Sequence, residues 1–156
     1  MLLPFFEWCE TTSVAQWVSS GVWQFATIEA IHLLGLGLLG GSLLLVDLRM
    51  LGVGLTRQAI ADLDAHMRVW LIAALVLMAV TGVPLFLSEA IKCYHNASFW
   101  VKMATLPFAL TYTFGVRARV ARSSRETTMR TRLAGAVSIA LWFTVAAAGR
   151  WIGFSS

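Results

Sequence analysis

The sequence contains few charged residues, because only 13% of its 156 residues are Asp, Glu, Lys or Arg while 58% are hydrophobic. Soluble domains carry about a quarter of their residues as charged ones, so the composition excludes an ordinary soluble domain. The chain also has only two cysteines and three histidines. The first ten residues lack the basic segment of a cleavable signal peptide, and we therefore expect none.

Long hydrophobic runs fill most of the chain. A membrane-spanning helix needs about 20 mostly apolar residues, and the runs at about 25–46, 69–87, 99–116 and 133–152 qualify. The runs are continuous rather than alternating and are too few for a barrel, which favours helices. We predict an all-α fold, a bundle of four transmembrane helices in one domain spanning residues 1–156. Such a chain offers almost no place for an enzyme site that acts on a large soluble substrate.

Basic residues gather at one side of this predicted bundle. The segments after the first and third helices contain Arg49, Arg57, Arg68, Arg117, Arg119, Arg122, Arg125, Arg130 and Arg132. Only Lys92, Lys102 and Arg150 lie at the opposite side. The positive-inside rule then places both termini outside, in the periplasm of a bacterial inner membrane. The net charge of +4 needs no nucleic acid to explain it, and an alternative role for the second segment is a lipid-headgroup or partner site.

Ionisable residues inside a bilayer are costly and suggest function. His32 is the strongest candidate, because neutral imidazole is a good ligand for transition metals. Counting about 1.5 Å per residue from the cytoplasmic ends places His32, Gly82 and Trp142 in one layer, roughly 20 Å above that border. A histidine for iron, a small residue to admit a flat ring and an aromatic to pack it predict a b-type haem between facing helices.

Further residues complete the predicted haem site. Gly35 lies on nearly the same face as His32, and Lys102 and Arg150 are cations suited to the haem propionates. For the opposite iron ligand we expect His95 first and Met103 second, with a histidine from a neighbouring subunit as a third option. Two strong axial ligands suit electron transfer, here between quinone or a membrane partner and the periplasm.

Other interpretations of His32 stay open. It could hydrogen-bond to Glu29, which in turn pairs with Lys102, in a purely structural cluster, or it could serve proton or substrate transport. Glu29 and His32 also form half of a di-iron Glu-x-x-His site, but the chain has no second such pair and we reject that reading. We interpret His66 as a solvated histidine at the membrane border. A non-catalytic accessory subunit of a larger membrane complex is the alternative function.

Two further pairs of residues carry predictions. Gly37 and Gly41 form a close-approach face on the first helix that points away from His32, and it seats either a neighbouring helix or a second copy in a homo-oligomer. Cys9 and Cys93 both fall at the predicted outer, oxidising side of the membrane. We predict a disulfide between them, with two unrelated thiols as the alternative.

Several phrases together resemble a known family. They are "HLLGLGLLGGSLLLVDLRMLG", in which Asp47 begins an Asp-Leu-Arg-x-Leu-Gly ending, and "TGVPLFLSEAIKCYHNASFWVKM", in which Trp100 and Lys102 form an aromatic-x-Lys pair. The resemblance is to small bacterial four-helix membrane proteins that are catalogued only as a domain of unknown function. It covers nearly the whole chain and implies the four-helix topology, but it supplies no activity.

Overall fold

The computed structural model describes residues 2–154, and these residues form helices and short connections without a strand. In chain order the elements are α1 (Leu3–Glu10), α2 (Ser13–Ser19), α3 (Val22–Leu51), α4 (Ile60–Ser88), α5 (Ala90–His95), α6 (Ala97–Tyr112), the π-helical turn η1 (Thr113–Arg117), α7 (Ala118–Arg122) and α8 (Met129–Ile152). The turn η1 joins α6 directly to α7, so the chain stays helical from 97 to 122. The all-α prediction is confirmed.

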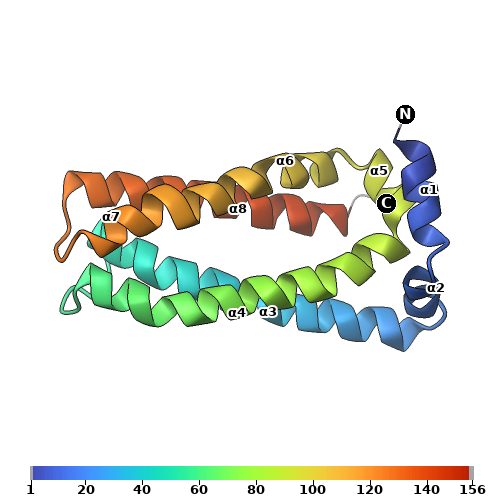
Figure 1. Ribbon diagram of the computed structural model, residues 1–156, viewed down its shortest axis with the longest axis horizontal. Helices are drawn as coiled ribbons and strands as arrows, with labels where there is room; N and C mark the ends of the chain where they lie inside the picture. The colour runs from blue at the N-terminus through green and yellow to red at the C-terminus, as the bar shows by residue number, and fades with distance from the viewer. Residues whose placement is uncertain (1, 155–156) are drawn as a thin grey trace.

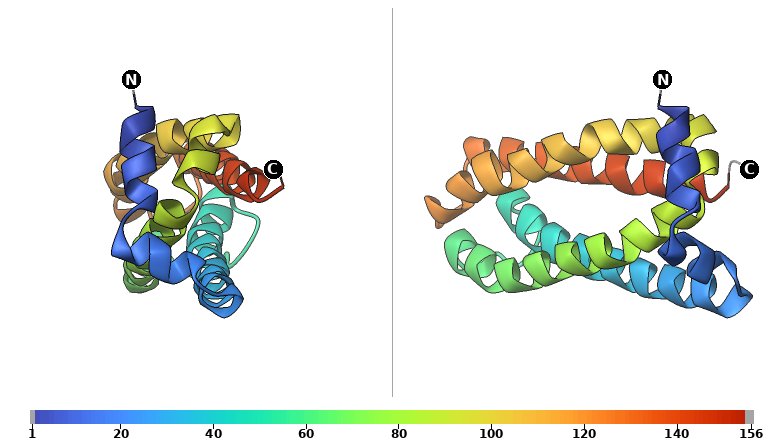
Figure 2. Two further views of the ribbon diagram at one scale, coloured as in Figure 1. Left: turned by 90° about the vertical axis from the view of Figure 1, so that its right-hand side faces the viewer. Right: turned by 45° about the vertical axis from the view of Figure 1, so that its right-hand side comes forward.

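The long helices form two pairs that lie side by side, α3 with α4 and α6–η1–α7 with α8 (Figure 1, Figure 2). Both chain ends lie at the same end of the bundle, together with α1, α2 and α5; we call this the terminal end. The connections 52–59 and 123–128 lie at the other end, which we call the arginine-rich end. The first and last described residues thus lie at the same end of the bundle.

Local sequence signals explain where the helices begin and end. Gly52 ends α3 in the left-handed conformation, with φ 81°, which glycine adopts without steric cost. Asn96 and Thr128 begin α6 and α8, because their side chains accept hydrogen bonds from the first-turn N–H groups. Pro4 occupies the first turn of α1, where a proline needs no N–H partner. The helices α1 and α5 were not predicted, because each is too short to carry a clear periodic pattern.

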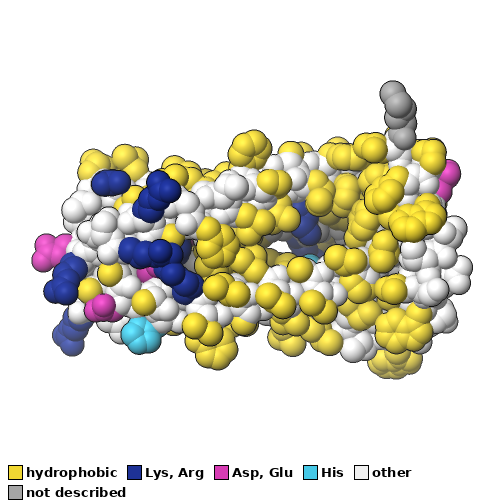
Figure 3. Space-filling view, in the orientation of Figure 1, with side chains coloured by type: hydrophobic (Ala, Val, Ile, Leu, Met, Phe, Trp, Pro, Cys, Tyr) yellow, Lys and Arg dark blue, Asp and Glu magenta, His cyan; other side chains and the backbone are white. Residues whose placement is uncertain are grey.

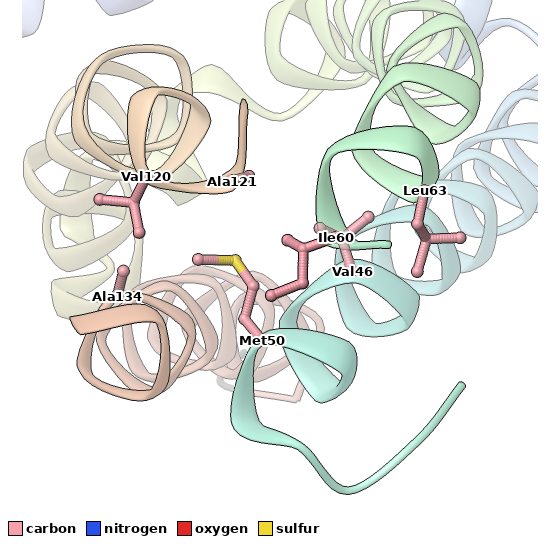
Figure 4. Close-up of a cluster of buried hydrophobic side chains, with 7 residues drawn as sticks. All are labelled: Val46, Met50, Ile60, Leu63, Val120, Ala121 and Ala134. Carbon is pink, nitrogen blue, oxygen red and sulfur yellow. The ribbon is translucent and has the colours of Figure 1, made fainter. Parts of the chain in front are cut away.

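Three buried clusters follow one another along the bundle. At the arginine-rich end, Met50 and Ile60 are completely buried among residues from both helix pairs (Figure 4). A middle cluster contains Leu39, Leu43, Leu71 and Ala74, with Trp142 packed against it. At the terminal end, Phe6 packs with Cys9, Ala90, Cys93 and Phe99, and so fixes α1 against α5 and α6. Each cluster joins elements that are distant in sequence.

Helices α3, α4 and α8 are long and apolar enough to cross a membrane, with mean hydropathies of 1.9, 2.4 and 1.5. Large apolar side chains cover the outside of the bundle, such as Val69 at 71% exposed and Phe143 at 73% (Figure 3). A surface of this kind is stable against lipid rather than against water. The structure therefore supports a multi-pass membrane protein in which lipid contacts these helices.

Candidate functional site

The face of the bundle shown in Figure 3 is hollowed near its middle, between the two helix pairs. Hydrophobic side chains surround the opening, while a Lys or Arg side chain and part of a histidine are visible at its base. His66 and His95 are exposed, whereas His32 is half-buried, and Lys102 is half-buried on α6. His32 is the one histidine among the described residues that is not exposed, and the charge of Lys102 acts on its ring, so we assign these two side chains to the hollow.

Hydrogen bonds fix the ring of His32 in one tautomer. Its Nδ1 lies 2.7 Å from Oγ1 of Thr81, and that hydroxyl donates its single proton to the carbonyl of Leu77, also at 2.7 Å. The Thr81 oxygen can then only accept from the ring, so Nδ1 carries the hydrogen and Nε2 keeps its lone pair. Thr81 is the ring's one hydrogen-bond partner within residues 2–154. Since no buried nitrogen or oxygen there lacks a partner, Nε2 is not sealed within apolar contacts.

Two glycines behave differently around this histidine. A Cβ added to Gly82 would lie 3.1 Å from Cε1 of His32, so the ring rests directly on the α4 backbone. A Cβ added to Gly35 would instead lie 3.3 Å from Leu77 and from the sulfur of Met78. Gly35 thus lets α3 and α4 approach each other, and Gly82 makes room for the histidine.

Lys102 lies on α6, and its side chain packs against Gly149 of the neighbouring helix α8. Its Nζ lies 3.5 Å from the position of a Cβ on Gly149, and its charge acts on the ring of His32 and on the thiol of Cys93. No carboxylate of residues 2–154 forms an ion pair with it. A half-buried ammonium without an acidic partner is costly in an apolar layer. The hollow therefore contains one unpartnered cation and one imidazole lone pair.

The remaining predicted site residues lie elsewhere. His95 is exposed on α5 and lines a shallow surface depression with Leu2, Tyr94 and Trp100. Met103 is 46% exposed on the outside of α6. Arg150 stacks 4.4 Å above the ring of Phe154, near the end of α8.

Trp142 donates its indole N–H to Thr113 at 2.9 Å and packs against the middle cluster. Glu29 is exposed and has no ion pair among the described residues, so the structural Glu29–His32–Lys102 cluster is not formed. His66 is exposed, and its Nδ1 lies 2.7 Å from the carbonyl oxygen of Asp62, in agreement with a border histidine.

A model of a family of unknown function, DUF6644, matches residues 5–155. The chain belongs to this family. The resemblance drawn from its sequence motifs to a domain of unknown function is thereby confirmed. No curated protein and no solved structure matches the DUF6644 chain, so its activity must be argued from its own residues.

A second polar cluster lies at the arginine-rich end, and sequence reasoning missed it. Arg117 on η1 is 2% exposed and forms ion pairs with Asp47 on α3 and, at 3.4 Å, with Asp64 on α4. Ser138 on α8 donates to the second oxygen of Asp47 at 2.7 Å. Asp64 also pairs with Arg68 at 3.1 Å at the rim. This cluster, which we call the inner charge cluster, joins all four long helical segments.

The inner charge cluster corrects the interpretation of two arginines. Arg117 and Arg49 were counted with the charges that set topology, but both are buried, at 2% and 5% exposed. Arg49 donates to the carbonyls of Gln58 and Arg125 and to the hydroxyl of Thr127, and so ties the two connections together. The missed signal is the presence of Asp47 and Asp64 near the ends of otherwise apolar helices, where a carboxylate needs a partner.

The cysteines do not form the predicted disulfide. Cys9 and Cys93 are both free, although they lie in the same buried cluster with Phe6 and Phe99. Burial raises the pKa of the Cys93 thiol to about 11, and burial also raises the pKa of Cys9. Both groups are therefore protonated thiols at neutral pH.

Proposed function

We propose that the protein is a small b-type haem protein of the bacterial inner membrane, with the haem held in the hollow and its iron bound by Nε2 of His32. The observation that carries the proposal is the 2.7 Å distance between Nδ1 of His32 and Oγ1 of Thr81, because it leaves Nε2 as the nitrogen that can bind iron. Haem and other metal sites commonly use a histidine whose second nitrogen donates to a fixed acceptor, because this orients the ring and raises its basicity. Thr81 occupies that position for His32.

The walls of the hollow suit a flat, largely apolar macrocycle that carries carboxylates. Hydrophobic side chains surround the opening, and Gly82 and Gly149 let the side chains of His32 and Lys102 lie directly against the helix backbones. A propionate would supply the acidic partner that Lys102 lacks among the described residues. When bound, haem would supply one-electron chemistry; the chain would orient it, neutralise a carboxylate and exclude water.

The redox role that we propose is electron transfer between a quinone or another membrane partner and the periplasm. The hollow is open on the side of the bundle where apolar side chains predominate, which suits reactants that arrive within the membrane.

The proposed topology has four spans with both termini in the periplasm. The continuous helix from 97 to 122 would be the fourth span, beside the three that meet the criteria of length and hydropathy. Arginines remain concentrated at the end away from the termini even after Arg49 and Arg117 are set aside as buried. A reporter enzyme that works only in the periplasm should be active when it is fused to the C-terminus. Activity of a reporter that works only in the cytoplasm would refute this orientation.

The haem assignment is tested by purifying the protein after expression with abundant haem and recording its absorption spectrum. The full chain, expressed with abundant haem, should carry a Soret band, and His32→Ala should lose most of it while still inserting in the membrane. His66→Ala is the matched control, because His66 is an exposed histidine at the arginine-rich end. A His32→Ala protein with a wild-type spectrum, or a wild-type protein without haem, would reject the assignment.

A second candidate function is that of an accessory subunit or homo-oligomer that packs through α3. A Cβ added to Gly37, Gly40 or Gly41 would meet nothing within 4 Å, so this face of α3 is free of contacts within the described residues. Bare glycine faces allow helices to approach closely in membranes. Native mass spectrometry from nanodiscs distinguishes the cases: a monomer that carries haem favours the first function, and a haem-free oligomer favours the second.

A further inference from the structure

We propose that the short helices α1 and α2 lie flat in the membrane–water interface at the terminal end, where the headgroup layer of the lipid bilayer is their partner. The inference is carried by a pattern of exposed and buried side chains that the two helices share. It rests on the insertion of the long helices in a membrane. It is independent of the haem and of the side of the membrane that the terminal end faces.

The exposed apolar face of α1 recurs in α2 nine residues later. Phe5 and Trp8 of α1 are 53% and 61% exposed, and Val14 and Trp17 of α2 are 46% and 58% exposed. The members of each pair are three residues apart and therefore lie on one face of their helix. Each short helix thus presents one large apolar pair that no other described residue covers.

A second face of each short helix packs against the bundle. Phe6 and Cys9 of α1 are 5% and 1% exposed, in the buried cluster that also includes residues of α5 and α6. Ala15 and Val18 of α2 are almost completely buried, and α2 packs against α4. Both helices are therefore fixed to the terminal end by one face, and this leaves the apolar pair on a neighbouring face directed outward.

The level of these helices along the bundle matches a headgroup layer. Residues 69–88 of α4 carry no charged side chain, and at about 1.5 Å per residue they extend about 30 Å, the thickness of the hydrocarbon core. The polar border then falls at Glu89 and Lys92, which form a partly exposed ion pair at 3.6 Å. Helix α1 lies at this border, because Glu10 accepts a hydrogen bond at 2.8 Å from the N–H of Ile91.

The orientation of the two helices agrees with this level. Figure 1 shows α1 running across the end of the bundle, and the end-on view in Figure 2 shows both short helices lying across it. Helices in this orientation are parallel to the membrane plane when the long helices span the membrane. Amphipathic helices that lie in this plane place their apolar side chains at the boundary between headgroups and acyl chains.

Tryptophans surround the terminal end and favour lipid as the partner. Five of the seven tryptophans lie in α1, in α2 or in the adjoining turns of the long helices, and they are 40–82% exposed: Trp8, Trp17, Trp23, Trp100 and Trp151. Tryptophan is enriched at membrane–water interfaces, because its ring is apolar and its indole N–H needs a polar partner. The apolar surface of the long helices continues onto this end (Figure 3), so one lipid layer can contact both.

The test measures the depth of spin labels on the full chain in lipid vesicles. Single cysteines replace Trp8 and Trp17, and the matched controls are Glu7 and Gln16, the exposed polar residues that precede them. Labels at Trp8→Cys and Trp17→Cys should be relaxed more by oxygen, which concentrates in lipid, than by a water-soluble nickel complex. Labels at Glu7→Cys and Gln16→Cys should shift toward the nickel complex. The unchanged protein, whose two cysteines are buried, gives the background labelling.

A preference for the nickel complex at either tryptophan position would overturn the inference, because that face would then lie in water. Labels shielded from both reagents would also overturn it and would indicate a second copy or a partner protein on this face. A check without labels uses the double variant Trp8→Phe, Trp17→Phe. It should lose part of the fluorescence quenching by lipids brominated near the headgroup, and a loss confined to quenching by aqueous acrylamide would contradict the inference.

Discussion

At the arginine-rich end a buried guanidinium joins carboxylates from two helices, and a serine hydroxyl from a third completes the cluster. Near the middle of the bundle the helix pairs instead enclose a hollow whose ammonium has no acidic partner among residues 2–154. Charges that are paired and hydrogen-bonded fix one arrangement of helices. A charge without a partner and a free imidazole lone pair instead leave capacity for a ligand. In our proposal, the inner charge cluster fixes the arrangement of the helices and the hollow binds a ligand.

The largest difference in stability should appear when the charge of Arg117 in the inner charge cluster and that of Lys102 in the hollow are removed in separate variants. Arg117→Leu would leave Asp47 and Asp64 without their buried partner, and the free energy of unfolding should fall by about 3–5 kcal/mol. Lys102→Leu in haem-free protein should be neutral or slightly stabilising, because it removes a half-buried charge and leaves no carboxylate among the described residues unpaired. Reversible unfolding in detergent micelles measures both changes, and equal losses would contradict the comparison.

Alanine substitutions at two glycines should give a smaller difference in stability between a closely packed position and one without contacts. A Cβ on Gly135 would lie 2.9 Å from the carbonyl oxygen of Asp47, and Gly135→Ala should therefore cost about 1–3 kcal/mol by forcing α3 and α8 apart. Gly41→Ala is the matched control, because a Cβ there meets nothing within 4 Å. It should be neutral or stabilise by up to about 1 kcal/mol. A large loss at Gly41, measured in the same unfolding assay, would instead indicate a partner on that face.

Alkaline pH should weaken the terminal end through Cys93. Burial raises its pKa from 9.0 to about 11, so the folded state retains a proton that the unfolded state loses between those values. This contribution is complete below pH 9 and should disappear by about pH 11, with a loss of about 1–2 kcal/mol. Cys93→Ser should remove this part of the pH dependence. If the free energy of unfolding changes with pH equally for the wild type and Cys93→Ser between pH 8 and 11, the thiol contributes nothing to this pH dependence.

The fold could be predicted from sequence because its main signals are long and local. Continuous apolar runs predicted helices within α3, α4 and α8, and the structure extends each of them at both ends or at one. The predicted run 69–87 omitted the first turns of α4, since Asp62, Asp64, His66 and Arg68 read as a polar connection. Asp64 is nevertheless helical, because Arg117 on η1 and Arg68 one turn further along α4 both pair with its carboxylate.

The site could be predicted only in part. Counting residues along antiparallel helices correctly brought His32 to Gly82, because helix rise is uniform. It could not find the bond to Thr81, which depends on the rotation of α4 about its axis. The pairing of Arg117 with Asp47 joins residues 70 apart in sequence, and no local pattern reveals a contact of that separation.

The most direct test of the central claim replaces the ring of His32 and then restores it. His32→Gly should lose haem, and added imidazole should restore the Soret band by filling the space beside Gly82 and Thr81. Thr81→Val, which removes the acceptor of the Nδ1 hydrogen, should alter the restored spectrum. Restoration by imidazole would establish that the hollow binds haem through this histidine. Retention of the haem spectrum by His32→Gly without imidazole would contradict the account.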